Sequence, residues 1–331
     1  MSPDYWMPLV FLGLMGLAML IYVVLDGFDL GVGMLMVGAS DAHKDRMVAS
    51  IGPFWDANET WLVLGVGVLL IAFPKAHGLI LNAMYLPVAV MLLGLILRGV
   101  AFDFRVKADA QWKPLWNRAF MGGSLLAALA QGWMLGRYIT GFESGWAFTL
   151  FSAAIALALA AAYALLGAGW LLMKAEGELQ RLALVRAKKV WPAVVLGLAL
   201  ISLATPWLSP TVRERWFQMP ALIALLPIPL MTGLALLVLR AQLNSSRVLG
   251  KLCWLPFVLT VAVMVLGFFG LAYSLYPYVM IDRMTVWQAA AAPKSLAFIL
   301  VGCAITVPVI LAYTVFAYRV FWGKAAELHY G

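Results

Sequence analysis

Apolar residues along the chain form nine long runs, separated by short polar segments. Each run is long enough, or nearly so, to cross a membrane as an α-helix, which takes roughly 20 residues. The longest runs, the first, fifth and ninth, should tilt or project beyond the bilayer. The pattern predicts nine transmembrane helices, over residues 5–37, 54–73, 79–101, 119–138, 146–173, 191–208, 220–239, 252–273 and 295–322.

The segments between these runs are short, and the longer ones, 102–118, 174–190 and 274–294, leave no room for a separate soluble domain. Apolar residues make up 64% of the 331 residues and charged residues only 11%, and the mean hydropathy is +0.95. The first run follows no Lys or Arg and is too long for a signal peptide, so we interpret it as a retained helix. The fold class is therefore an all-α polytopic membrane protein.

The formal net charge of +8 arises from lysines and arginines confined to the segments between runs. With the N-terminus outside, 17 of the 23 Lys and Arg residues fall in the inner segments and tail, and six fall outside. This asymmetry follows the positive-inside rule and predicts an N-out, C-in topology. It also accounts for the basic charge without a nucleic-acid partner.

Two apolar runs end alike, which suggests an internal duplication. Gly31-Val32-Gly33 in the first helix and Gly167-Ala168-Gly169 in the fifth are each followed by a charged amphipathic stretch. Two four-helix units, over residues 1–138 and 139–273, would fit this similarity. The outer loop, ninth helix and cytoplasmic tail would then occupy residues 274–331.

The first three predicted helices place charged residues inside the membrane margin. Acids three residues apart share one helix face, and the predicted topology brings all of these helix ends to a similar cytoplasmic depth. The charged side chains of this group are Asp26, Asp29, Asp56, Glu59, Arg98 and Asp103.

Two interpretations of this group remain open. In the structural one, the acids cap the second helix and pair with Arg98 to fix helix packing. In the functional one, a single arginine cannot neutralise so many acids, and surplus carboxylates mark a proton or ion path. A stand-alone proton or cation transporter would also use such acids, but the sequence lacks paired broken helices at the midplane.

Ligands for a cofactor are scarce in this chain. His43 and His77 are expected in loops and His329 in the tail, so none occupies the middle of a helix, where an axial haem ligand belongs. Cys253 and Cys303 fall in apolar runs and are expected to be packing residues. We therefore predict no haem, no metal site and no catalytic residue in this chain itself.

Four motifs resemble subunit II of cytochrome bd-type quinol oxidases. In chain order they are Leu25-Asp26-Gly27-Phe28-Asp29-Leu30-Gly31-Val32-Gly33, Pro53-Phe54-Trp55-Asp56-Ala57-Asn58-Glu59-Thr60-Trp61, Arg98-Gly99-Val100-Ala101-Phe102-Asp103-Phe104-Arg105, and the pair Tyr276-Pro277-Tyr278-Val279 and Thr285-Val286-Trp287-Gln288-Ala289-Ala290. The nine-helix plan extends this resemblance over the whole chain.

The resemblance implies a haem-free subunit of a quinol:oxygen oxidoreductase. In this family subunit I carries haem b, haem d and the quinol site. The complex reduces oxygen to water with cytoplasmic protons, and so builds a membrane potential without pumping. In some members subunit II holds a structural quinone in an apolar groove. Expected partners are subunit I, small single-helix accessory subunits and the lipid bilayer.

The resemblance also assigns roles to residues. We hypothesise that Asp56, with Asp29 and Asp26, gathers protons for subunit I, that Arg98 keeps one carboxylate ionised, and that Asp103 lies at the entrance. Glu59 stands where some members have Gln, which weakens its assignment as a proton carrier. Trp55, Asn58 and Trp61 are expected to pack or to form the subunit interface. The short loops of the second half suggest the cyanide-insensitive branch.

Overall fold

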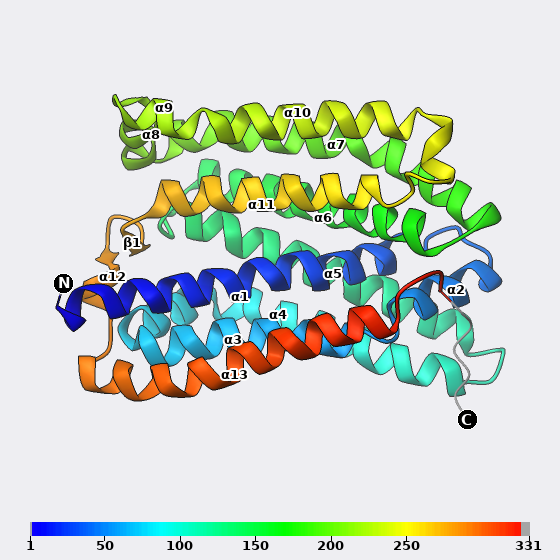
Figure 1. Cartoon of the computed structure of the whole chain (residues 1–331), viewed down its shortest axis with the longest axis horizontal. Coiled ribbons are helices and arrows are strands. Elements are labelled where there is room, and N and C mark those ends of the chain that lie inside the picture. The colour runs from blue at the N-terminus through cyan, green and yellow to red at the C-terminus, as the bar shows by residue number, and fades with distance from the viewer. Residues whose placement is uncertain (1, 326–331) are drawn as a thin grey trace.

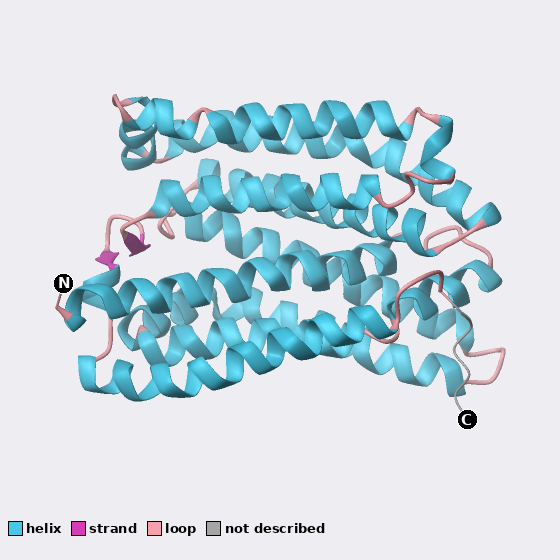
Figure 2. Cartoon of the chain, viewed as in Figure 1, coloured by secondary structure: helices cyan, strands magenta, loops and turns pink. Residues whose placement is uncertain are grey.

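The computed structural model describes residues 2–325, and His329 lies outside that range. Within this range nine helical segments are long and apolar enough to cross a membrane, as the sequence pattern predicts. They dominate the structure (Figure 2). The segments are α1 (Pro3–Met34), α3 (Trp55–Ala72), α4 (Pro74–Lys107), α5 (Lys113–Ile139), α6 (Trp146–Lys174), α7 (Gly177–Leu208), Ala221–Leu243, α11 (Leu255–Leu275) and α13 (Pro293–Val320).

Short elements lie at the two ends of the bundle (Figure 1). The end where α1 begins carries α8 (Pro210–Phe217), α12 (Val286–Ala289) and an antiparallel pair of strands, β1 (Tyr278–Met280) and β2 (Met284–Thr285). We name it the α8 end. The opposite end carries α2 (Asp41–Ile51) and is named the α2 end. The turn η1 (Ser246–Leu249) joins the seventh spanning segment to α11.

Some expected boundaries were wrong. Residues 174–190, expected as a loop, are mostly helical, because α7 already begins at Gly177. Leu179, Ala183 and Ala187 are buried and follow one another every four residues, so they form an apolar stripe that packs inward. The seventh segment is divided into α9 (Ala221–Leu225) and α10 (Pro227–Leu243). The break lies just before Pro227, because proline has no backbone N–H to continue the hydrogen bonding of a helix.

The histidines in the described range also lie in helices rather than in loops. His43 belongs to α2, and His77 belongs to the first turns of α4, which begins at Pro74, earlier than the hydropathy pattern indicated. Proline is favoured at the first helical position, because its missing N–H would have no partner there. Cys253 and Cys303 are both free, as expected.

The long helices run side by side along one axis (Figure 1). Helix α1 packs against α3, α5 and α6, and the pairs α4–α5 and α6–α7 form the most extensive contacts. The backbones of α1 and α6 touch where Gly31 meets Gly167, because a Cβ at Gly31 would collide with the carbonyl oxygen of Tyr163. The two similar glycine stretches of the sequence therefore meet at this crossing.

An aromatic cluster fills the core toward the α2 end. Phe28 stacks on Trp170 with ring centroids 4.1 Å apart, and Phe54 stacks on Tyr318 at 4.4 Å. These contacts join α1, α6, α13 and the residue that precedes α3, so segments far apart in the sequence become one rigid unit. Tyr318 of this unit also contacts the polar residues described next.

Candidate functional site

A buried polar centre lies where α1, α3 and α4 meet. Asp26 and Asp29 are completely buried, and Arg98 is only 1% exposed. The Arg98 Nη2 donates to Asp26 Oδ1 at 2.6 Å and also to the carboxylate of Glu59. One guanidinium thus bridges an acid of α1 and an acid of α3, and it fixes the position of both helices against α4.

Asp29 is held by an amide instead of a cation. The Asn58 Nδ2 donates to Asp29 Oδ2 at 2.7 Å and, at 3.4 Å, to the carbonyl of Leu25. The Asn58 Oδ1 accepts a hydrogen bond of 3.1 Å from the hydroxyl of Tyr318 on α13. The structure therefore places Asn58, which was expected only to pack, inside the hydrogen-bond network of the acids.

The two tryptophans of the motif pack around this centre. The Trp55 ring lies 5.0 Å from the Phe102 ring, and the Arg98 guanidinium lies 5.9 Å from the Trp55 ring centroid. Trp61 is buried and clusters with Tyr22. Both indoles exclude water and lipid from the charged groups, which strengthens the electrostatic interactions between them.

The structure does not bring Asp56 and Asp103 into this centre. Both side chains are exposed, and neither makes a hydrogen bond or ion pair with the part of the chain that the structure describes. Glu59 is intermediate between the buried and the exposed acids, since its side chain is 27% exposed while its carboxylate contacts Arg98. It is the predicted acid that connects the buried centre with the surface.

A second polar chain, which the sequence motifs did not indicate, continues inward from the acids. The Tyr163 hydroxyl donates to Gln131 Oε1 at 2.8 Å, and Gln131 Nε2 donates to the Tyr22 hydroxyl at 2.8 Å. Tyr22 lies one helical turn before Asp26 on the same face of α1. Two signals were present in the sequence, namely this four-residue spacing and a glutamine inside an apolar run.

The centre holds three carboxyl groups around one guanidinium, so uptake of a proton neutralises an excess negative charge. Several of its buried polar atoms have no hydrogen-bond partner among residues 2–325: Asp26 Oδ2, Asp29 Oδ1, Trp61 Nε1, Arg98 Nε and Arg98 Nη1. Buried polar atoms of this kind are usually bridged by ordered water. The arrangement suits a group that binds and releases protons through water.

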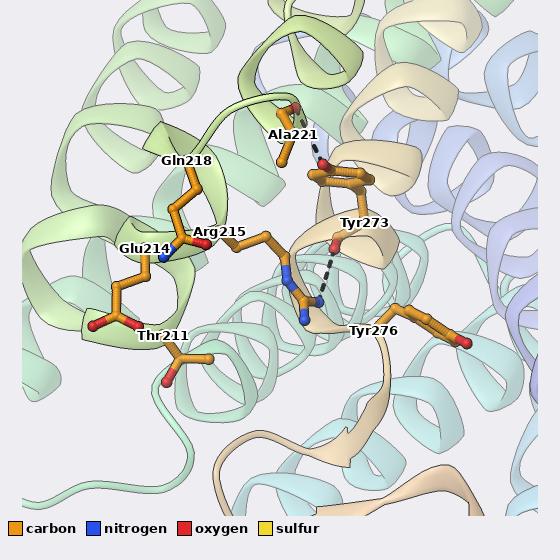
Figure 3. A pocket seen from close by; sticks show the side chains of 7 residues that line it. All are labelled: Thr211, Glu214, Arg215, Gln218, Ala221, Tyr273 and Tyr276. Atoms are coloured by element: carbon orange, nitrogen blue, oxygen red, sulfur yellow. Dashed lines mark hydrogen bonds between the residues drawn. The ribbon is translucent and has the colours of Figure 1, made fainter.

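Two observations concern other places where a ligand could bind. Among the described residues, no group of three or more His, Cys, Asp or Glu side chains is placed to hold a metal ion. A pocket at the α8 end is lined by Glu214, Arg215 and other polar residues (Figure 3), and none of the predicted site residues lines it. It differs from the apolar groove expected for a structural quinone, which stays a prediction.

Comparisons with known proteins agree on one family. The family model described as cytochrome bd terminal oxidase subunit II matches residues 7–321. Cytochrome bd-I ubiquinol oxidase subunit 2 of Escherichia coli K12 is 25% identical over 95% of this chain and 94% of its own length. The probable cytochrome oxidase subunit 2 of Haemophilus influenzae is 26% identical over 96% and 94%.

A shorter and stronger match is cytochrome bd ubiquinol oxidase subunit 2 of Bacillus subtilis, which is 39% identical over 39% of this chain and 38% of its own length. In three dimensions the chain is similar to the bd oxidase from Geobacillus thermodenitrificans, with a TM-score of 0.78, 16% identity, and coverage of 96% of this chain and 99% of that one. The fold and the resemblance inferred from the motifs are thereby confirmed. The chain belongs to the cytochrome bd terminal oxidase subunit II family and is a subunit of an oxidoreductase complex.

Proposed function

We propose that this chain is the haem-free subunit II of a quinol:oxygen oxidoreductase, and that it delivers cytoplasmic protons to the oxygen-reducing haem site of subunit I. Relatives along the whole chain are named ubiquinol oxidase subunit 2, which supports a quinol as the electron donor. The observation that carries the proton role is the buried centre of Asp26, Asp29 and Glu59 around Arg98.

The route that we propose begins at the surface. Asp103 and Asp56 are exposed on spanning helices near the α2 end, where contact with lipid hydrocarbon would be costly for a carboxylate. We place them against subunit I or the cytoplasmic water layer, where they collect protons. Glu59 then connects this surface to Asp26 and Asp29, which hold the proton before its transfer to subunit I.

The inner polar chain would end this route. A carboxyl or a water molecule can accept a proton on one side and release one on the other, but a glutamine amide keeps its N–H protons. Gln131, fixed between Tyr22 and Tyr163, would therefore donate a hydrogen bond toward the acids and stop protons from moving deeper. Such a stop prevents a leak across the membrane.

The orientation that we propose puts the α2 end in the cytoplasm, with the N-terminus outside. It rests on the distribution of Lys and Arg between the two sets of connecting segments. In that orientation the exposed Asp56 and Asp103 lie on the side from which the consumed protons must come.

The test is an Asp29→Asn variant in the purified oxidase complex. Turnover with quinol should fall at least about tenfold while the haem spectrum stays intact, because the amide cannot take up a proton. Asp4→Asn, an exposed acid at the α8 end, is the control and should not change turnover. Unchanged turnover in Asp29→Asn would remove this residue from the path, and loss of haem would indicate a structural role.

The alternative, a stand-alone proton or cation transporter, makes a different prediction. The chain alone in liposomes would then move protons or cations without subunit I. Oxygen consumption that requires both subunits, with no transport by the isolated chain, supports the oxidase assignment.

A further inference from the structure

A pocket at the α8 end has features that the proton path does not use. It has a volume of about 520 Å³ and lies between α8, the start of α9 and the end of α11 (Figure 3). Its lining residues, most of them polar, are Thr211, Glu214, Arg215, Gln218, Ala221, Tyr273 and Tyr276. It therefore differs from the apolar surface that spans most of the molecule.

Hydrogen bonds join α8 and the start of α9 to α11 beside this pocket. The Trp216 Nε1 donates to Ser274 Oγ at 2.7 Å, and the Tyr273 hydroxyl donates to the carbonyl of Ala221 at 3.1 Å. These bonds tie α8 and α9 to α11. The pocket is consequently pre-formed, and a ligand would not have to order a loop in order to bind.

Arg215 supplies a cation with unused donors. Its Nη1 donates to the carbonyl of Tyr273 over a long 3.4 Å, and no carboxylate of the described residues lies within 4.0 Å of it. A guanidinium has five N–H donors in a planar fork, which matches the oxygens of a phosphate. Among residues 2–325 its guanidinium makes a hydrogen bond only to the Tyr273 carbonyl, which Figure 3 shows, so most of its donors are available to a ligand.

Glu214 supplies the opposite charge on another wall. It precedes Arg215 in α8, but the two side chains point to different parts of the pocket and do not form an ion pair (Figure 3). A ligand that carries only negative charge would meet this carboxylate unfavourably. The two charges together fit a zwitterion, with its anionic group at Arg215 and its cationic group at Glu214.

The surroundings of the pocket suit an amphiphile. Apolar side chains next to the lining residues in the sequence are strongly exposed: Phe217 by 62%, Met219 by 70% and Ile223 by 62%. Trp207, at the end of α7, is 82% exposed, as expected for a tryptophan at a membrane–water boundary. Acyl chains can lie on these groups while a head group enters the pocket.

We propose that this pocket binds the head group of a phospholipid with a primary ammonium, of the phosphatidylethanolamine type. Its phosphate would bind Arg215 and its ammonium would bind Glu214. Inorganic phosphate shares the chemistry of the first contact, but it uses neither Glu214 nor the exposed apolar side chains. The proposal is independent of the proton path, because none of the acids of that path lines the pocket.

The experiment is native mass spectrometry of the purified, delipidated oxidase complex with added phosphatidylethanolamine, with phosphatidylglycerol of the same acyl chains, or with inorganic phosphate. The wild type should retain phosphatidylethanolamine preferentially. Arg215→Gln should weaken its binding about 10- to 100-fold, the loss expected for a charge-assisted hydrogen bond. Glu214→Gln should abolish the preference over phosphatidylglycerol.

The matched control is Arg213→Gln, an exposed arginine of the same helix that does not line the pocket; it should bind as the wild type does. Equal retention by the wild type and Arg215→Gln would overturn the proposal. Displacement of the lipid by millimolar inorganic phosphate would overturn the lipid assignment in favour of a phosphate site. Glu214→Gln changes an exposed side chain, so it should fold even where Arg215→Gln does not.

Discussion

Replacing Arg98 by methionine should strongly destabilise the chain, because it leaves two acids without their cation. The guanidinium is almost fully buried and donates to Asp26 at 2.6 Å and to Glu59. Removing one partner of a buried ion pair costs about 3–5 kcal/mol, since the remaining charge stays desolvated. The contribution of Glu59 is smaller, because its side chain is 27% exposed and water can screen it.

A double-mutant cycle isolates the term that belongs to the pair of Arg98 and Asp26. Asp26→Asn alone removes a charge but leaves Arg98 with Glu59, so we expect a loss of about 1.5–3 kcal/mol. Arg98→Met combined with Asp26→Asn should be less destabilised than the sum of the single changes by about 2 kcal/mol. Arg98→Lys should fall between the wild type and Arg98→Met, because one ammonium cannot fork between two carboxylates.

The measurement is equilibrium unfolding of the purified complex in mixed micelles with increasing SDS. Tryptophan fluorescence can report it, because Trp55 and Trp61 pack at the site. If the double variant equals the sum of the single variants to within about 0.5 kcal/mol, the two groups do not interact and the electrostatic account of the centre is refuted.

Four further substitutions and one control test other parts of the structure. Asn58→Leu should lower the free energy of unfolding by about 1–3 kcal/mol in the same titration, because it leaves the buried Asp29 carboxyl without its donor. Tyr318→Phe removes one hydrogen bond to the Asn58 amide and should lower it by only about 0.5–1.5 kcal/mol. Gly31→Ala should prevent assembly, seen as loss of the haem spectrum, because its Cβ would collide with the backbone of α6; Gly13→Ala in the same helix has open space and should assemble normally. Gln131→Glu should raise the passive proton leak of proteoliposomes, since a carboxyl can relay a proton; an unchanged leak would count against the proposed stop.

The nine helices could be predicted because hydropathy and length are local properties of the sequence. The bilayer requires long apolar runs, and each run corresponds to a helical segment of the structure. The start of α7 could not be placed in the same way, because residues 177–190 are charged and helical. Their buried apolar residues, Leu179, Ala183 and Ala187, follow a four-residue spacing, which mean hydropathy does not detect.

The pattern of buried residues in α3 also explains why Asp56 does not lie in the buried polar centre. The buried residues of α3 are Asn58, Trp61, Gly65, Val68 and Ala72, a stripe with spacings of three and four residues. Glu59 is one residue from Asn58 and flanks this stripe, whereas Asp56 is two residues before it and points to the opposite side. The three-residue spacing of the two acids was correct, but it did not tell which face is buried.

Partners from distant segments could not be predicted. Tyr318 reaches Asn58 across 260 residues of sequence, and Gln131 reaches Tyr22 across 109. Such contacts depend on how the helices pack, and packing depends on close approaches such as the one between Gly31 and Gly167. Without that geometry, a tyrosine near a helix end resembles any other interfacial aromatic residue.

The two halves of the chain contribute unequally to the polar centre. The aspartates of α1 lie five and two residues before Gly31, and the same offsets before Gly167 give Ala162 and Leu165. If the halves are duplicates, only the first carries the acids. A second set of carboxylates at the crossing of α1 and α6 would add like charges in a region of low dielectric, where their repulsion is strong.

What the second half supplies at this crossing is Tyr163. Its ring packs against Gly27, where a Cβ would lie 2.8 Å from a ring atom, and its hydroxyl holds the amide of Gln131. This neutral phenol fixes Gln131, which in turn donates to Tyr22, and it adds no charge to the crossing. At the crossing of α1 and α6, the first half therefore carries the acids, and the second half contributes a neutral tyrosine that holds Gln131.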